Sequence, residues 1–170
     1  MTLREEAVRL DVSDRPIEAL QAYERARVAG ELTLEDCLNV AGLCLELADP
    51  GYAASVGIAN MQDLPELRPI VAQVLREADG RFGPTPDVTF MRAYADFVLN
   101  GIDFPEEQFK KVGSFQTFDW GAFWRVVSGI CRDRTSVESL LSSLRGESTV
   151  ARRRIESILR GVLARSWRLM

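Results

Sequence analysis

Helix pairing in this chain is expected to start from Pro16-Ile17-Glu18-Ala19-Leu20-Gln21-Ala22-Tyr23-Glu24-Arg25-Ala26. Within this run an alanine, Ala19, is followed four residues later by the aromatic Tyr23 and three residues after that by Ala26. Small residues at the alanine positions allow two helices to approach closely, and the aromatic ring fills the groove between them. Cap and first-turn signals before Pro16, and a glycine at position 30, predict a helix over residues 16–29.

This pattern resembles the second helix of a tetratricopeptide (TPR) repeat, and it recurs in part at the spacing of that family. Adding the TPR period of about 34 residues places the next repeat's apolar, small and proline positions at Cys37, Val40, Ala41, Cys44, Ala53 and Pro65. The aromatic position falls on Gly57, and the family's tryptophan and tyrosine are absent from the first helix of this repeat. The resemblance covers residues 3–65 and weakens after residue 48.

The resemblance implies stacked antiparallel helix pairs, and the alternative is an irregular helical bundle. In a TPR-like unit the inner surface comes mainly from the first helix of each pair. The resemblance therefore implies that Asn39 is a polar contact that holds the backbone of a bound ligand.

The rest of the chain predicts an all-α protein. Thr33 and Asp36 form a capping-box pattern before a helix over residues 34–48, and apolar periodicity predicts further helices over 64–80 and 87–100. A short or irregular element is expected over residues 52–61, because Gly57 lowers helix propensity there. We expect a single domain over residues 1–170, with TPR-like pairs in 1–80, an aromatic-rich helical segment in 81–134 and basic helices in 135–170.

Composition narrows the function. The chain has 170 residues, 46% of them hydrophobic and 27% charged, and it contains no histidine. Without histidine there is no Ser-His-Asp or Cys-His nucleophile system and no histidine-bearing zinc or iron site. No other catalytic constellation is found, so we expect no enzyme activity, no metal and no cofactor. The three dispersed cysteines are expected to be small buried hydrophobic residues.

The location is expected to be cytoplasmic. The N-terminus is charged and lacks the apolar core of a signal peptide. No uninterrupted apolar run approaches the length needed to span a membrane.

Aromatic residues crowd into one part of the chain, at Phe104, Phe109, Phe115, Phe118, Trp120, Phe123 and Trp124. Aromatic side chains dominate interface hot spots, so this cluster could form a partner-binding groove, with Phe115, Phe118 and Trp120 as candidate contacts. The alternative is that the cluster fills the core where the last helices fold back. Phe115 and Phe118 are expected to be exposed, since residues 113–118 are the least helical part of the region.

The C-terminal region is strongly basic. Residues 145–170 carry seven arginines against two glutamates, a formal charge of +5, whereas residues 1–144 carry −9. Such a region could contact nucleic acid, an anionic membrane surface or an acidic protein, or it could be a solvated basic helix. Residues 136–163 also loosely resemble a helix-turn-helix, with Arg152, Arg153 and Arg154 near the start of its second helix. Arg160 is a further candidate contact.

From these features we expect a non-catalytic helical protein that binds another protein or a peptide, as an adaptor, chaperone, immunity or assembly factor. The alternative is a regulator that binds nucleic acid through the C-terminal arginines.

Overall fold

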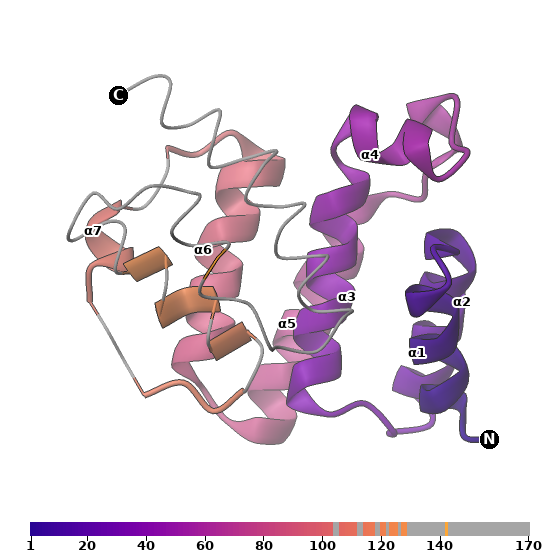
Figure 1. Cartoon of the computed structure of the whole chain (residues 1–170). Helices are drawn as coiled ribbons and strands as arrows, with labels where there is room; N and C mark the ends of the chain where they lie inside the picture. The colour runs from indigo at the N-terminus through magenta and orange to yellow at the C-terminus, as the bar shows by residue number, and fades with distance from the viewer. Residues whose placement is uncertain are drawn as a thin grey trace.

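The chain folds into helices that pack around one central helix, as a computed structural model shows (Figure 1). The structure describes residues 1–103, 106–111, 114–117, 120, 121, 123–125, 127, 128 and 142. These residues contain no strand, which confirms the all-α prediction for the part of the chain described. In order, the elements are α1 (Leu3–Val12), α2 (Pro16–Val28), α3 (Leu34–Leu47), α4 (Pro50–Ser55), the 3-10 helix η1 (Met61–Asp63), α5 (Leu67–Phe82), α6 (Pro86–Asn100) and α7 (Glu106–Phe109).

Helices α1 and α2 form a hairpin at one side of the molecule (Figure 1). Ala19 and Ala26 on α2 are fully buried, and Tyr23 between them is 2% exposed, which confirms the predicted burial of this stripe. The Tyr23 hydroxyl donates a hydrogen bond to Asp11 Oδ2 on α1, at 3.2 Å. Small side chains and one aromatic residue therefore hold this pair of helices together.

The central helix is α3. Eleven of its fourteen residues are buried, and it packs against α2, α4, α5 and α6. A helix that is buried nearly all round belongs to the core of a protein. Its predicted capping box is confirmed, because Thr33 Oγ1 accepts a hydrogen bond from the Asp36 amide and the Asp36 carboxylate accepts one from the Thr33 amide. Asp36 also forms an ion pair with Arg4, which ties α1 to α3.

The segment after α3 is irregular, as predicted. Helix α4 has six residues and η1 has three, and Gly57 between them has a positive φ of 89°. Glycine adopts a positive φ readily because it has no Cβ atom. The next long helix, α5, packs along α3.

Helices α5 and α6 form a second hairpin. Helix α5 begins at Leu67 and ends at Phe82, slightly later at both ends than predicted, whereas α6 ends at Gly101 in the left-handed conformation, as expected. The Arg68 guanidinium donates from Nε and Nη2 to the Leu99 carbonyl, at 3.0 and 2.7 Å, and so joins the two helices at this end.

The aromatic residues pack against one face of α6. Phe109, Trp120, Phe123 and Trp124 are all fully buried. Phe109, Phe123 and Trp124 contact Phe90 or Tyr94 of α6, and Trp120 stacks on Trp124. Of the two readings of the aromatic cluster, the described members take the one in which they fill the core. Phe104 and Phe118 lie outside the described residues.

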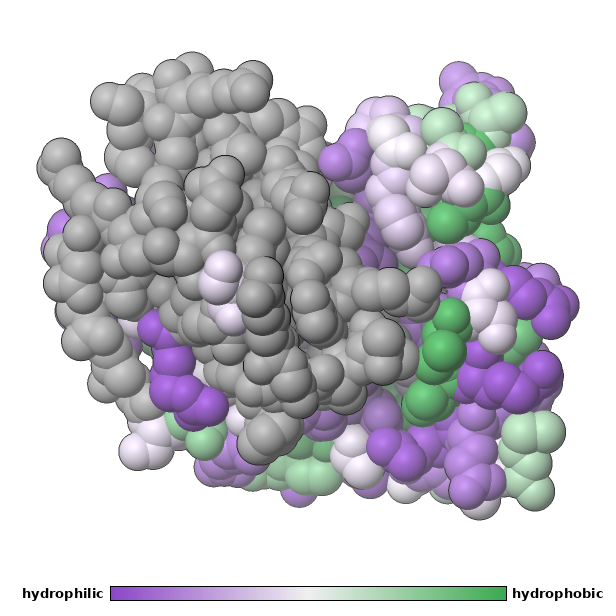
Figure 2. All heavy atoms as spheres, in the orientation of Figure 1, coloured by the Kyte–Doolittle hydropathy of each residue, from purple (hydrophilic) through white to green (hydrophobic). Residues whose placement is uncertain are grey.

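The surface around the α1–α2 hairpin is mixed in hydropathy (Figure 2). On the face shown in Figure 2, side chains around the α1–α2 hairpin are mainly hydrophilic, with smaller hydrophobic areas between them. Within the described part of the chain, no helix is both long enough and apolar enough to cross a bilayer.

Candidate functional site

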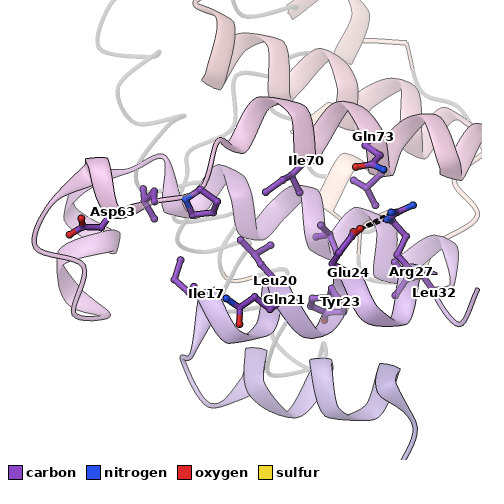
Figure 3. Close-up of a pocket in the computed structure, with 14 residues that line it drawn as sticks. Ile17, Leu20, Gln21, Tyr23, Glu24, Arg27, Leu32, Asp63, Ile70 and Gln73 are labelled. Carbon is purple, nitrogen blue, oxygen red and sulfur yellow. Dashed lines mark hydrogen bonds and ion pairs between the residues drawn. The ribbon is translucent and has the colours of Figure 1, made fainter. Parts of the chain in front are cut away.

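An open groove lies between α2 and α5 (Figure 3). Its volume is about 700 Å³, within the range of about 300–1,000 Å³ that is typical of ligand-binding clefts. We call it the α2–α5 groove, and it is lined by Ile17, Leu20, Gln21, Tyr23, Glu24, Arg27, Leu32, Val40, Asp63, Leu64, Pro65, Ile70, Gln73 and Val74.

The floor of the groove is apolar. Leu20, Leu32, Val40 and Val74 are each less than 8% exposed, and they come from α2, the loop before α3, α3 and α5. Above them, Ile17, Leu64 and Ile70 are half-buried at the mouth. Figure 3 shows Ile17 and Leu20 of α2 directed toward α5, with Ile70 facing them from the other wall.

The groove stays open because its two walls pack on other helices. Helix α2 uses its alanine face against α1, whereas α5 packs on α3 and α6. The aliphatic side chains Ile17 and Leu20 on α2 and Ile70 on α5 are too short to close the remaining space. A concave lining with a buried apolar floor and half-buried aliphatic side chains at its mouth is typical of ligand-binding clefts.

One end of the groove is closed by an ion-pair network. The Arg27 guanidinium donates to Glu24 on its own helix, at 2.6 and 2.7 Å, and to Glu77 on α5, at 2.7 Å. These contacts raise the pKa of Arg27, and the same contact with Arg27 lowers the pKa of Glu24. Arg81 adds a hydrogen bond from Nη2 to the Gly30 carbonyl, at 3.1 Å, so the helices are joined firmly here.

The other end of the groove is a loop with free acidic groups. Asp63 and Glu66 flank Leu64 and Pro65, and both carboxylates are exposed. Neither carboxylate forms an ion pair or a side-chain hydrogen bond with any residue in the described part of the chain. Figure 3 places Asp63 at the opposite end from Arg27.

The groove contains few ionisable side chains. Its two carboxylates, Glu24 and Asp63, lie toward opposite ends, and Glu24 is occupied by Arg27. Across the residues that the structure describes, no group of three or more acidic or cysteine side chains is placed to hold a metal ion. The groove offers apolar contact in its centre and polar contact at its rim.

A second, smaller hollow of about 210 Å³ lies between α5 and α6. Three arginines line it, but Arg68 is bound to the Leu99 carbonyl and Arg92 to Asp79. Only Arg76 has no such partner among the described residues. This hollow therefore offers a ligand less apolar contact than the α2–α5 groove does. It also offers fewer free hydrogen-bond donors than its three arginines suggest.

Two of the predicted contact residues are brought together by the fold, outside the groove. The Trp120 indole Nε1 donates a hydrogen bond to Asn39 Oδ1 on α3, at 2.9 Å, and the Trp120 amide donates to Glu35 Oε1, at 3.3 Å. Trp120 is fully buried. In this structure Asn39 therefore binds a side chain of its own chain, and Trp120 belongs to the core.

Phe115, the third described candidate, is half-buried rather than exposed. Its ring packs on Phe90, with centroids 5.1 Å apart. The segment that carries it is held by the buried Asp87 carboxylate, which accepts hydrogen bonds from the amides of Gln116 and Thr117, at 2.8 and 3.0 Å. The expectation that Phe115 is exposed is therefore wrong, because Asp87 fixes this segment against α6.

The remaining candidates, Phe118, Arg152, Arg153, Arg154 and Arg160, lie outside the described residues. The cysteines that are described, Cys37 and Cys44, are buried on α3 and form no disulfide. Burial raises the pKa of the Cys37 thiol to about 12, so this thiol stays protonated at neutral pH.

The sequence patterns did not predict the α2–α5 groove. Its signal was present, because Ile17 and Leu20 lie on α2 outside the stripe of Ala19, Tyr23 and Ala26 that pairs with α1. A helix with a second apolar side either meets another helix or leaves that side open.

No family model, no curated protein and no solved structure matches this chain. The TPR resemblance stays a prediction, and the case for function depends on the geometry of the chain itself.

Proposed function

We propose that this chain is a non-catalytic helical protein that binds a segment of another protein in the α2–α5 groove, as an adaptor, chaperone, immunity or assembly factor does. The observation that carries the proposal is an apolar floor of buried aliphatic side chains beneath a groove of about 700 Å³. Concave sites lined mainly by apolar side chains, with a few polar groups at the rim, are typical of places where ligands and partner segments bind.

The length of the groove supports a peptide-sized ligand. Along α2 its lining runs from Ile17 to Arg27, which corresponds to about 15 Å at the rise of an α-helix. Two helices form its long walls, and an amphipathic helix in such a groove is a common mode of peptide recognition. A partner segment of about three helical turns would cover this length.

The charge of the described region supports a protein partner over nucleic acid. Residues 1–103 contain nine arginines and no lysine against eighteen acidic residues, a formal charge of −9. Such a surface repels phosphate groups, because affinity for nucleic acid comes largely from cations that neutralise phosphates.

Nucleic-acid binding through residues 145–170 remains the second candidate, because that region has a formal charge of +5. A gel shift at several salt concentrations, repeated with Arg152, Arg153 and Arg154 changed to Glu, tests it. Tight binding that the triple variant loses would support nucleic-acid binding and contradict a purely protein-binding role.

The groove itself is tested by selecting short helical segments from a displayed peptide library and measuring their affinities by titration calorimetry. Ile17→Ser removes an aliphatic group from the mouth, and we expect it to weaken binding about tenfold. Val28→Ser is the matched control, since Val28 lies on the same helix, is 74% exposed and does not line the groove. Equal affinities for both variants would contradict the proposal.

A further inference from the structure

We propose that the segment bound in the α2–α5 groove is an amphipathic helix whose aliphatic stripe is flanked at one end by basic residues, and that these basic residues lie at the Asp63 end of the groove. This inference rests on the proposed function and adds the chemistry of the partner. It comes from an asymmetry of charge between the two ends.

The Arg27 end is formally neutral. Two guanidinium groups, on Arg27 and Arg81, offset two carboxylates, on Glu24 and Glu77, through ion pairs of 2.6 to 3.9 Å. Arg27 is only 20% exposed at its side chain, and it already donates to two carboxylates. A partner therefore finds no unbalanced charge at this end, which is also where α2 and α5 are tied together.

The opposite end carries a formal charge of −2. Asp63 lines the groove, and Glu66 follows it at the start of α5. Both carboxylates are free within the described residues. The nearest arginine along the chain, Arg68, does not offset them, because its guanidinium is directed to the Leu99 carbonyl on α6.

The centre of the groove selects aliphatic groups. The floor consists of leucine and valine side chains, and the mouth of Ile17, Leu64 and Ile70. Tyr23 is the aromatic member of the lining, and its hydroxyl donates to Asp11 on α1. The central lining therefore favours leucine-like side chains that recur on one face of a helix.

The net charge of the surrounding region also favours a basic partner. Residues 1–103 carry a formal charge of −9, which attracts a basic segment during the approach. This long-range attraction does not depend on the groove, so an experiment must separate it from local contacts with Asp63 and Glu66. The long-range attraction depends on the total charge, whereas the local contacts need Asp63 and Glu66 themselves.

The experiment uses the full chain and three synthetic peptides of about fourteen residues, close to four helical turns. All three carry the same leucines at positions i, i+4 and i+7, and two flanking residues at one end are both lysine, both glutamate or both glutamine. Affinities are measured by fluorescence anisotropy at low and at high salt. We expect the lysine peptide to bind about three- to tenfold tighter than the glutamate peptide at low salt, and this ratio to shrink with added salt.

Two double variants with equal changes in net charge locate the effect. Asp63→Asn with Glu66→Gln removes the free acidic groups at the groove, whereas Glu106→Gln with Glu107→Gln removes two carboxylates on α7, far from it (Figure 1). We expect the lysine preference to fall to near unity in the first variant and to persist in the second.

The outcomes separate this inference from the proposed function. If the three peptides bind equally well, or if the two double variants reduce the preference equally, the groove binds helices but the basic partner is wrong. A tighter fit of the glutamate peptide would also overturn the inference. If none of the three peptides binds, and the segments selected by display bind without regard to Ile17, the groove itself is not the binding site.

Discussion

Helices pack differently in two regions of this protein, around α6 and around α2. Around α6, large rings interlock, with Phe90 and Phe109 stacked at 5.0 Å between centroids and Phe123 and Trp124 at 4.6 Å. Around α2, alanines bring α1 close, while the opposite side of α2 faces α5 across an open groove. The region with the most aromatic residues is therefore the filled one.

This difference shows that a segment rich in aromatic residues need not form a binding surface. Aromatic side chains are enriched at interfaces, but they also bury large areas inside a protein and fill space that shorter side chains leave. In this chain Phe109, Phe123 and Trp124 pack onto α6 and fill that region. The groove lies between two helices that each pair with another helix, and its centre is lined by shorter aliphatic side chains.

Removing a ring from the filled region should have the largest effect. Trp124 is fully buried and contacts Phe90, Tyr94, Phe109 and Phe123. We expect Trp124→Ala to lower the free energy of unfolding by about 3–5 kcal/mol, because it deletes a large buried side chain and leaves a cavity. Urea denaturation measures this loss, and a change below about 1 kcal/mol would show that the aromatic region is not the core of the fold.

The bond between the aromatic segment and α3 should have an intermediate effect. Asn39→Leu removes the acceptor of the buried Trp120 indole N–H. We expect a loss of about 1–2 kcal/mol in the free energy of unfolding, since a buried donor would be left without a partner. In a Trp120→Phe background the same substitution should cost much less, and additive effects in this double-mutant cycle would show that the two side chains do not interact.

The smallest effect on stability is expected in the groove. Ile17 is half-buried at the mouth and leaves no enclosed cavity when shortened. We expect Ile17→Ser to change the free energy of unfolding by less than about 1 kcal/mol, while it weakens peptide binding. A loss as large as that of Trp124→Ala in the same denaturation experiment would mean that the groove is part of the core.

Many local elements could be predicted because their signals are short-range. Thr33 and Asp36 cap α3 three residues apart, and Gly101 ends α6 where its positive φ is needed. The start of α5 was placed three residues too early, at Leu64. The apolar period includes Leu64, but the helix itself begins at Leu67, with Pro69 in its first turn.

Contacts between residues far apart in the sequence could not be predicted in this way. Asn39 and Trp120 were each selected as a contact for a partner, yet they are 81 residues apart in sequence and bind each other. Nothing near either residue indicates the other, because their meeting depends on how the chain returns to α3. Phe115 was expected to be exposed, but the carboxylate of Asp87, about 30 residues earlier, holds its segment in place.

The amino-acid order alone determined that this protein is helical in its described part, where α2, α3 and α6 begin and end to within a few residues, and that no histidine is available for catalysis. Caps, glycines and apolar periods act within one or two turns of a helix, so they can be recognised locally. Only the tertiary structure decided which apolar face is covered. Phe109, Phe123 and Trp124 are fully buried against α6, whereas Ile17 stays half-buried at the mouth of the groove, because burial depends on which element packs opposite a side chain.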